Sequence, residues 1–264
     1  MFKAGFIQFQ PLRKNVEHNL NEIRRLCEGV EADLLVLPEL ANTGYMYANR
    51  YDLMNYAEAG DGSGIFLDGL MQLAKEKQTV FVTGFAEHTP DHLFNSAAAV
   101  SSQGILQVYR KTHLFNTEKL LFDPGDTGFT AFMTKDVVVG MMICFDWIFP
   151  ESARTLALME AQIIAHPSNL VLPWCQRAMV TRSLENRVFS ITANRYGAED
   201  LDGTTFDFTG ESQVLDIRGN LLAQAPVSGD SVKVVAIDPT LADNKAINDH
   251  NDLFEDRRKD FYFL

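Results

Sequence analysis

Apolar positions along the chain follow two different spacings, and the two alternate along the sequence. In residues 15–29 and 64–77, apolar side chains recur every three or four positions, as on one face of a helix. Residues 2–9 alternate instead, and residues 33–38 and 136–143 are almost continuously apolar, as in strands covered on both faces. By the same criteria we predict further strands at 80–87, 95–100, 105–110, 162–166, 190–194, 213–216, 223–224 and 231–238, and further helices at 151–161 and 174–188.

Two longer stretches follow neither spacing and are predicted to be loops. Residues 115–132 contain the turn signal Pro124–Gly125–Asp126, and residues 196–210 are polar and contain glycine. Pro167 is expected to end the strand before it. No repeat, low-complexity tract or linker marks a boundary, so we expect one domain over residues 1–264. Strands covered on both faces need helices on one side and a second sheet on the other, which predicts a layered α/β sandwich.

Composition narrows the classes of partner and cofactor. The formal net charge of −12 disfavours nucleic acid and anionic membranes as partners, and no apolar stretch reaches the length of a membrane span. The first residues are typical of a strand rather than a signal peptide. Cys27, Cys144 and Cys175 are widely spaced, which predicts free thiols and a cytoplasmic location. Without paired histidines or a glycine-rich phosphate loop, we expect no metal and no cofactor.

Three chemically complementary side chains follow predicted strands. Glu39 follows residues 33–38, Lys111 follows residues 105–110, and Cys144 follows residues 136–143. Taken singly, each has an ordinary interpretation: Glu39 as a solvated acid, Lys111 as part of a basic surface patch and Cys144 as an inert buried thiol. Because strand ends meet at one edge of a sheet, we expect the three to converge into an active site. A thiol at a strand-to-helix turn also predicts a favoured thiolate.

Two histidines offer an alternative partner for the thiol. His166 lies at the end of a predicted strand, where a hydrogen-bonded structural histidine is the commoner case. His113 lies two residues beyond Lys111 and could face the same side. The sequence alone leaves open a Cys–His dyad, as in a thiol protease.

Three motifs identify a family resemblance. Leu37–Pro38–Glu39, the segment 109–114 and Met142–Asp146, which continues to Phe149–Pro150–Glu151, resemble the three signatures of the nitrilase superfamily. These carbon–nitrogen hydrolases use a Glu–Lys–Cys triad. The resemblance covers nearly the whole chain and implies a four-layer α-β-β-α sandwich. It also implies pairing into a homodimer or higher homo-oligomer through the outer helical faces, with the tail at about 245–264 in the interface.

The resemblance further implies an amidase mechanism on a small-molecule amide. Glu39 would act as the general base and Cys144 as the nucleophile that forms a thioester, with release of ammonia. Lys111 and the backbone N–H of Phe145 would stabilise the oxyanion. Glu118, the family's second acidic residue, would hold Lys111 or the substrate amide.

The residues after Cys144 bear on the substrate. Relatives that hydrolyse N-carbamoyl amino acids resemble Cys-Asn-Asp-Arg-Arg there, whereas this chain has Trp147 and Ile148 in place of the arginines. We therefore expect an uncharged or apolar amide, although an arginine elsewhere, such as Arg177, could still bind a carboxylate. Phe145, Trp147 and Asn169 are candidate pocket residues. Nitrile or carbamoyl hydrolysis remains an alternative activity, and a catalytically inactive scaffold is a more distant one.

Overall fold

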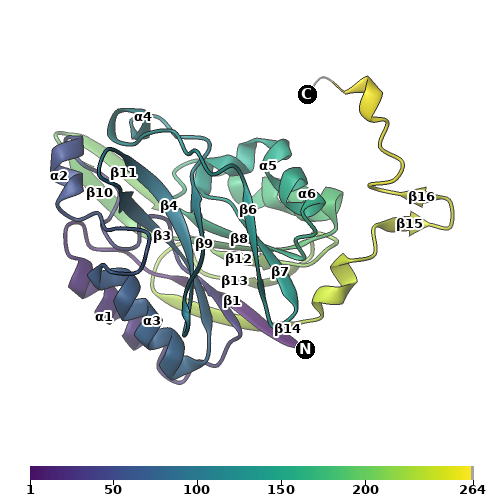
Figure 1. Ribbon diagram of the computed structural model, residues 1–264, viewed down its shortest axis with the longest axis horizontal. Helices are drawn as coiled ribbons and strands as arrows, with labels where there is room; N and C mark the ends of the chain where they lie inside the picture. Colours follow the sequence, from purple (N-terminus) through teal and green to yellow (C-terminus); the bar gives the residue numbers. More distant parts are fainter. Residues whose placement is uncertain (263–264) are drawn as a thin grey trace.

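Two six-stranded sheets pack face to face in the computed structural model, which describes residues 1–262 (Figure 1). The first sheet has the order β14 (Ser231–Ile237), β1 (Phe2–Gln8), β2 (Leu34–Val36), β3 (Val80–His88), β4 (Leu93–Ser101), β5 (Gly104–Arg110). The second has the order β13 (Leu221–Gln224), β12 (Gln213–Leu215), β9 (Phe189–Asn194), β8 (Ile163–Ser168), β7 (Val137–Met141), β6 (Thr130–Thr134).

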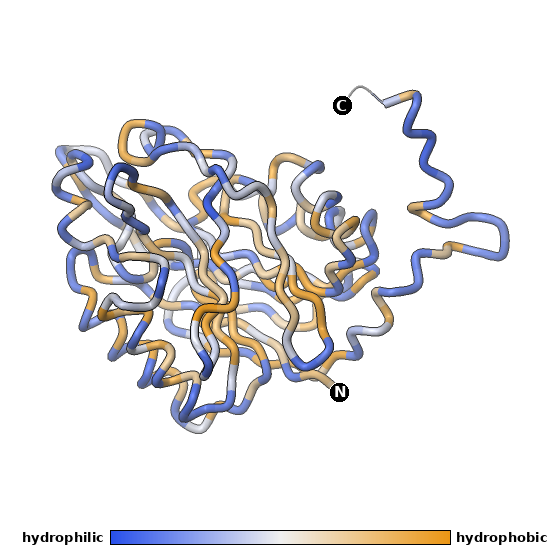
Figure 2. The backbone as a smooth tube through the Cα atoms, in the orientation of Figure 1, coloured by the Kyte–Doolittle hydropathy of each residue, from blue (hydrophilic) through white to orange (hydrophobic). Residues whose placement is uncertain are grey.

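Helices cover the outer face of each sheet. Helices α1 (Val16–Leu26) and α3 (Ile65–Lys77) lie on the first sheet, and α5 (Pro150–Leu158) and α6 (Cys175–Asn186) lie on the second (Figure 1). One hydrophobic cluster fills the space between the sheets and under α5 and α6, and a second lies under α1 and α3. The hydropathy of the chain follows this layering, with apolar strands inside and polar loops outside (Figure 2). The expected α-β-β-α sandwich is confirmed.

Strand direction explains why the predicted site residues converge. β2 is parallel to β3. β5 runs in the same direction as β3, because β4 lies between them and is antiparallel to each. In the second sheet β7, β8 and β9 are parallel to one another. Carboxyl ends of parallel strands share one edge of a sheet, which is where open α/β sheets bind ligands.

The prediction of a loop over residues 196–210 is wrong. This stretch forms a hairpin of β10 (Tyr196–Leu201) and β11 (Thr204–Thr209). Its two-residue turn, Asp202–Gly203, has φ values of 49° and 81°, as the tight turns favoured in hairpins require. Many hairpin residues face solvent, so the strands are polar and the sequence lacks an apolar run. The Asp-Gly pair was the signal that pointed to a hairpin.

Two other local predictions also need correction. The loop predicted at 115–132 contains α4 (Glu118–Leu121) and the first residues of β6. β8 continues through Pro167, since its pairing with β7 ends at Ala165 and only β9 remains bonded there. The chain also forms elements that the apolar spacing did not predict: α2 (Arg50–Met54), β15 (Ala246–Asn248), β16 (Asn251–Asp252) and the 3₁₀ turns η1 (Cys144–Ile148), η2 (Pro239–Ala242) and η3 (Lys259–Phe261).

The C-terminal segment, residues 245–262, is mostly hydrophilic and extends beyond the two sheets (Figures 1 and 2). Its Phe254 nevertheless packs against the first hydrophobic cluster, with the Arg154 guanidinium 5.0 Å from its ring centroid. Within the same segment, Phe261 and Tyr262 are exposed. Phe263 and Leu264, which belong to the tail expected at an interface, lie outside the described residues. Across residues 1–262, no helix combines the length and the apolar character that crossing a membrane demands.

Candidate active site

Glu39 lies immediately beyond β2, in a turn that brings its backbone against β3. Leu40 adopts a left-handed conformation with φ of 47°. Gly84 permits the contact, because a Cβ atom there would lie 2.4 Å from the Cα of Glu39. Oε1 of Glu39 accepts hydrogen bonds from Lys111 Nζ at 2.6 Å and Asn95 Nδ2 at 2.8 Å. Among the described residues, Oε2 of Glu39 has no hydrogen-bond partner. One oxygen is therefore fixed and the other is available to react.

Lys111 is held between two carboxylates. Besides Glu39, its Nζ donates to Oε1 and Oε2 of Glu118 at 2.9 and 2.8 Å. Glu118 is itself positioned by the Tyr45 hydroxyl at 2.7 Å and by the backbone N–H of Phe115 at 3.0 Å. Lys111, Glu39 and Glu118 are all buried. We call these three side chains the active-site cluster; when both carboxyls are ionised it contains two negative charges and one positive charge.

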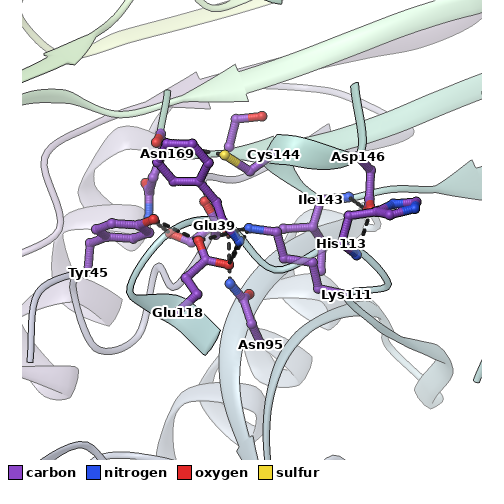
Figure 3. Close-up of polar contacts among 12 residues, drawn as sticks. Glu39, Tyr45, Asn95, Lys111, His113, Glu118, Ile143, Cys144, Asp146 and Asn169 are labelled. Atoms are coloured by element: carbon purple, nitrogen blue, oxygen red, sulfur yellow. Dashed lines mark hydrogen bonds and ion pairs between the residues drawn. The ribbon is translucent and has the colours of Figure 1, made fainter. Parts of the chain in front are cut away.

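Cys144 begins the 3₁₀ turn η1 in a strained backbone conformation, with φ of 40°. A non-glycine residue in this region is uncommon and must be held by its surroundings. The turn is fixed on both sides: the carboxylate of Asp146 accepts from the N–H of Ile143 at 2.8 Å, and His166 Nε2 lies 2.9 Å from the carbonyl oxygen of Cys144. The Cys144 thiol contacts the carbonyl oxygen of Asn169 at 3.7 Å. Glu39, Lys111, Glu118 and Cys144 thus lie around one small region (Figure 3).

Asp146 connects the Cys144 turn to the segment that carries Lys111. Its buried carboxylate accepts hydrogen bonds from the Tyr109 hydroxyl at 2.7 Å and from His113 Nδ1 at 2.7 Å. Tyr109 and His113 flank Lys111 in the sequence, so a single side chain aligns two of the three converging segments.

Neither histidine partners the thiol in the described residues. His113 bonds to Asp146 and stacks on Phe149, with ring centroids 3.8 Å apart. His166 contacts the Thr192 hydroxyl through Nδ1 and the backbone carbonyl of Cys144 through Nε2. Since a carbonyl only accepts, Nε2 must carry the proton. Burial lowers the pKa of His166 to about 4, so its imidazole is neutral near pH 7. The geometry gives both residues structural contacts rather than the geometry of a Cys–His dyad.

Burial is the largest influence on the ionisation of the site. It raises the pKa of Glu39, and the negative charge of Glu118 raises it further against the opposing effect of Lys111. Burial alone would lower the pKa of Lys111, but Glu118 and Glu39 together raise it well above its ordinary value. Lys111 is therefore a permanent cation, and Glu39 is a carboxyl poised to hold a proton.

The expectation of a favoured thiolate at Cys144 is wrong for the resting protein. Burial raises the pKa of the thiol well above its ordinary value, and the neighbouring Glu39 carboxylate adds to the effect. The turn also supplies less than a helix would, because η1 has five residues and α5 begins only at Pro150. A base must therefore remove the thiol proton during any reaction.

The candidate pocket residues do surround the thiol. Phe145, Trp147 and Asn169 line a space of about 10 Å³ beside Cys144, together with Phe115 and residues 170–172. Asn169 Nδ2 also donates to the backbone carbonyl of Glu39 at 2.9 Å, which fixes the turn of the base against that of the nucleophile. Arg177 is exposed on α6 and is not among the residues that line this space.

Sequence reasoning missed the residues that hold the site together. Asn95, Tyr45 and Asp146 are buried and bond directly to reactive side chains or to the Cys144 turn. Asn95 and Tyr45 have no distinguishing local pattern, and only Asp146, two positions after Cys144, was within a motif. Within residues 1–262, no group of three or more His, Cys, Asp or Glu side chains has a geometry that could hold a metal ion.

Comparison with known proteins identifies the family. The family model described as carbon-nitrogen hydrolase matches residues 3–246. A nitrilase from Pyrococcus abyssi is 42% identical over the full length of both chains. An (R)-stereoselective amidase from a Pseudomonas species is 35% identical, over 92% of this chain and 85% of its own.

Solved structures agree on the fold. The crystal structure of a carbon-nitrogen hydrolase from Helicobacter pylori superposes with a TM-score of 0.83 at 26% identity. The match covers 99% of this chain and 96% of that one.

Proposed function

The chain belongs to the carbon-nitrogen hydrolase family, and within that family we propose that it hydrolyses small amides through a Cys144 thioester, with release of ammonia. The observation that carries the proposal is the burial of Lys111 between two carboxylates beside a buried thiol. Glu39 differs from a purely structural partner of Lys111, because its Oε2 has no hydrogen-bond partner among the described residues.

Glu39 is the proposed general base. Its raised pKa suits proton transfer near neutral pH in both directions, and its Oε2 is the oxygen without a partner in the described chain. In the first step Oε2 takes the thiol proton and the sulfur attacks the amide carbon. Protonated Glu39 then gives this proton to the leaving nitrogen, and ammonia departs. The same carboxylate afterwards activates water to hydrolyse the thioester.

Lys111 is the proposed oxyanion donor. Its charge is maintained by Glu118 and Glu39, so it can stabilise negative charge on the substrate oxygen without losing its own proton. The backbone N–H of Phe145 is the proposed second donor. Such preorganised donors contribute roughly 3–4 kcal/mol each to stabilising a transition state. Glu118 positions Lys111 and takes no proton in this scheme.

The decisive test compares two cysteines. Cys144→Ala should abolish ammonia release from small amides, while Cys175→Ala, which alters another buried thiol, should retain it. Circular dichroism should show both variants folded. Comparable turnover in Cys144→Ala would end the proposal.

Nitrile hydrolysis is the second candidate activity. The relative named nitrilase, 42% identical, favours it. A nitrile has no carbonyl oxygen, so Lys111 would face the developing nitrogen anion of a Cys144 thioimidate instead. A panel of matched amides, carbamoyl compounds and nitriles, scored by ammonia release, separates these substrates; turnover of nitriles alone would replace the amide proposal.

We also propose that the protein forms a homodimer through α5, α6 and the C-terminal segment. Leu158, Met159, Val180 and Leu184 are exposed on the two helices, and such apolar surface favours burial against a partner. Sedimentation at micromolar concentration should show a species twice the 29.6 kDa chain mass. A cytoplasmic location is proposed from the three free, buried cysteines.

A further inference from the structure

A second cavity, of about 300 Å³, lies close to the active-site cluster. Three segments form its walls: residues 45–48, the segment that leads into and through α4, and the β10–β11 hairpin. The lining residues are Tyr45, Met46, Tyr47, Ala48, Asn116, Thr117, Glu118, Leu120, Leu121, Leu201, Asp202, Thr204 and Phe206.

This cavity shares a wall with the reacting centre. Glu118 lines it and at the same time binds Lys111, and Tyr45 lines it while donating to Glu118 (Figure 3). Phe115 lies on the other side of that wall: its ring lines the space beside Cys144, and its backbone N–H donates to Glu118. The short segment 115–118 therefore stands between the two spaces.

The space beside Cys144 is too small for a substrate of ordinary size. At about 10 Å³ it admits no more than about one water molecule. Any longer acyl chain must extend elsewhere. The ring of Phe115 is half-buried and packs on Phe145 with centroids 5.0 Å apart, so this side chain lies at the boundary that a longer acyl chain would have to cross.

The chemistry of the larger cavity discriminates between charges. Its lining contains two acids, Glu118 and Asp202, and no Lys, Arg or His among the described lining residues. The rings of Tyr45, Tyr47 and Phe206 add aromatic faces, which attract cations. Glu118 is already paired with Lys111, so Asp202 supplies the charge that discriminates between ligands. A carboxylate in this cavity would meet Asp202 with no cation among the described lining residues, whereas an ammonium group would meet Asp202 and the π-faces.

We propose that this cavity binds the part of the substrate that is not hydrolysed, and that it selects amides whose far end carries an ammonium group. Uncharged chains are intermediate, and chains that end in a carboxylate are excluded. This inference rests on the proposed amide hydrolysis and specifies its substrate class.

The test uses three amides of about equal length, which differ at the far end. 5-Aminopentanamide, hexanamide and glutaramate carry an ammonium, a methyl and a carboxylate group. For the full-length protein we expect kcat/KM to fall in that order. The preference for ammonium over carboxylate should also weaken at high salt, because Asp202 is exposed. Equal values for the three, or the reverse order, would overturn the inference.

A charge-removing variant locates the selectivity. In Asp202→Asn, the ratio of kcat/KM for 5-aminopentanamide to that for glutaramate should fall about threefold, the size expected for one exposed charge. Asparagine suits the left-handed turn position, so the hairpin is kept. Asp207→Asn is the matched control, because Asp207 is exposed on the same hairpin but is not among the lining residues. An unchanged ratio in Asp202→Asn, or an equal fall in the control, contradicts the assignment.

A variant that fills the cavity tests, without any change of charge, whether the acyl chain of the substrate binds there. Ala48→Trp at the mouth of the cavity should lower the ratio of kcat/KM for hexanamide to that for acetamide, whose acyl group needs little space. An unchanged ratio would place the long chain elsewhere. Suppose that the wild-type protein releases ammonia from acetamide, while the three longer amides show no charge preference and Ala48→Trp leaves the hexanamide ratio unchanged. In that case the inference about this cavity is wrong and the proposed amide hydrolysis stands. If the wild-type protein hydrolyses no amide, the proposed function itself is wrong.

Discussion

Two buried charge clusters lie near each other in this protein, and they differ in how their carboxylates are used. In the first, Lys111 is shared by Glu39 and Glu118. In the second, the fully buried Arg195 is paired with Glu199. Both oxygens of Glu199 accept further bonds from the backbone N–H groups of residues 45 and 46, at 2.8 to 3.2 Å. Glu39, by contrast, keeps one oxygen without a partner in the described chain.

The balance of charge separates a structural pair from a reactive one. Arg195 and Glu199 are one cation and one anion, and the Arg195 guanidinium also lies 4.2 Å from the ring centroid of Phe208. Both oxygens of Glu199 are occupied, so this pair has no free carboxylate oxygen to take a proton. The active-site cluster has one carboxylate in excess, and burial makes this excess costly, so Glu39 is driven toward its protonated form. The two clusters are linked, since Glu199 holds the loop of Tyr45, which binds Glu118.

The strongest test makes the active-site cluster resemble the structural pair. In Glu39→Gln, Lys111 and Glu118 remain as one cation and one anion. We expect ammonia release to fall by about 10³-fold or more, because an amide cannot carry the proton. The melting temperature should stay near the wild-type value or rise, since a carboxyl with a raised pKa no longer has to be buried. These two measurements on one protein check the comparison.

Loss of folding in Glu39→Gln would contradict the contrast between the two clusters, because Glu39 would then be a structural residue. A stable variant that retained wild-type turnover would instead remove Glu39 from the chemistry.

The second test breaks the structural pair. Glu199→Gln leaves the Arg195 charge buried without a counter-ion, which should cost about 3–5 kcal/mol in the free energy of unfolding. Denaturant titration measures this loss. Turnover per folded molecule should remain measurable, because no reacting atom is removed. A stable Glu199→Gln protein without activity would show that this pair takes part in the reaction rather than in folding.

The third test concerns pH. Because burial and Glu118 raise the pKa of Glu39 from its ordinary 4.5, the acid limb of kcat/KM should lie above pH 4.5, with activity rising as Glu39 loses its proton. The same shift means that the folded protein binds more protons than the unfolded one. The contribution of Glu39 to stability is therefore fully present below pH 4.5 and is lost as the pH rises through its folded pKa.

Glu118→Gln sharpens this test, since it removes the negative charge that raises the pKa of Glu39. The acid limb should move to lower pH in a pH–rate profile of this variant. A limb that stayed in place would assign the titration to another group.

The smallest expected effect comes from the histidines. His113→Ala removes one bond to Asp146 and the stacking on Phe149, while Tyr109 and the Ile143 N–H still hold Asp146. We expect a modest loss of turnover, and the same for His166→Asn, because the His166 imidazole contacts the Cys144 carbonyl and the Thr192 and Ser168 hydroxyls but not the thiol. Abolished activity in either folded variant would revive the Cys–His dyad.

The layered fold was predictable because its buried strands are marked by apolar runs. β2 and β7 are apolar on both sides, and this alone requires two covered faces. The β10–β11 hairpin was missed because its strands are largely solvent-facing and polar, which conceals them from hydrophobic periodicity. That hairpin forms one wall of the larger cavity. Hydrophobic periodicity therefore failed at the part of the chain that we propose selects the substrate.

The sequence by itself determined the chemical types of the site: an acid, a cation and a thiol, each directly after a strand. Only the tertiary structure decided their states. Whether Glu39 holds a proton, and whether Cys144 is a thiol, depend on burial and on neighbours such as Glu118, Asn95 and Tyr45 that come from distant segments. The physical reason is that the pKa of a side chain reflects the charges and the solvent around it, and these exist only once the chain has folded.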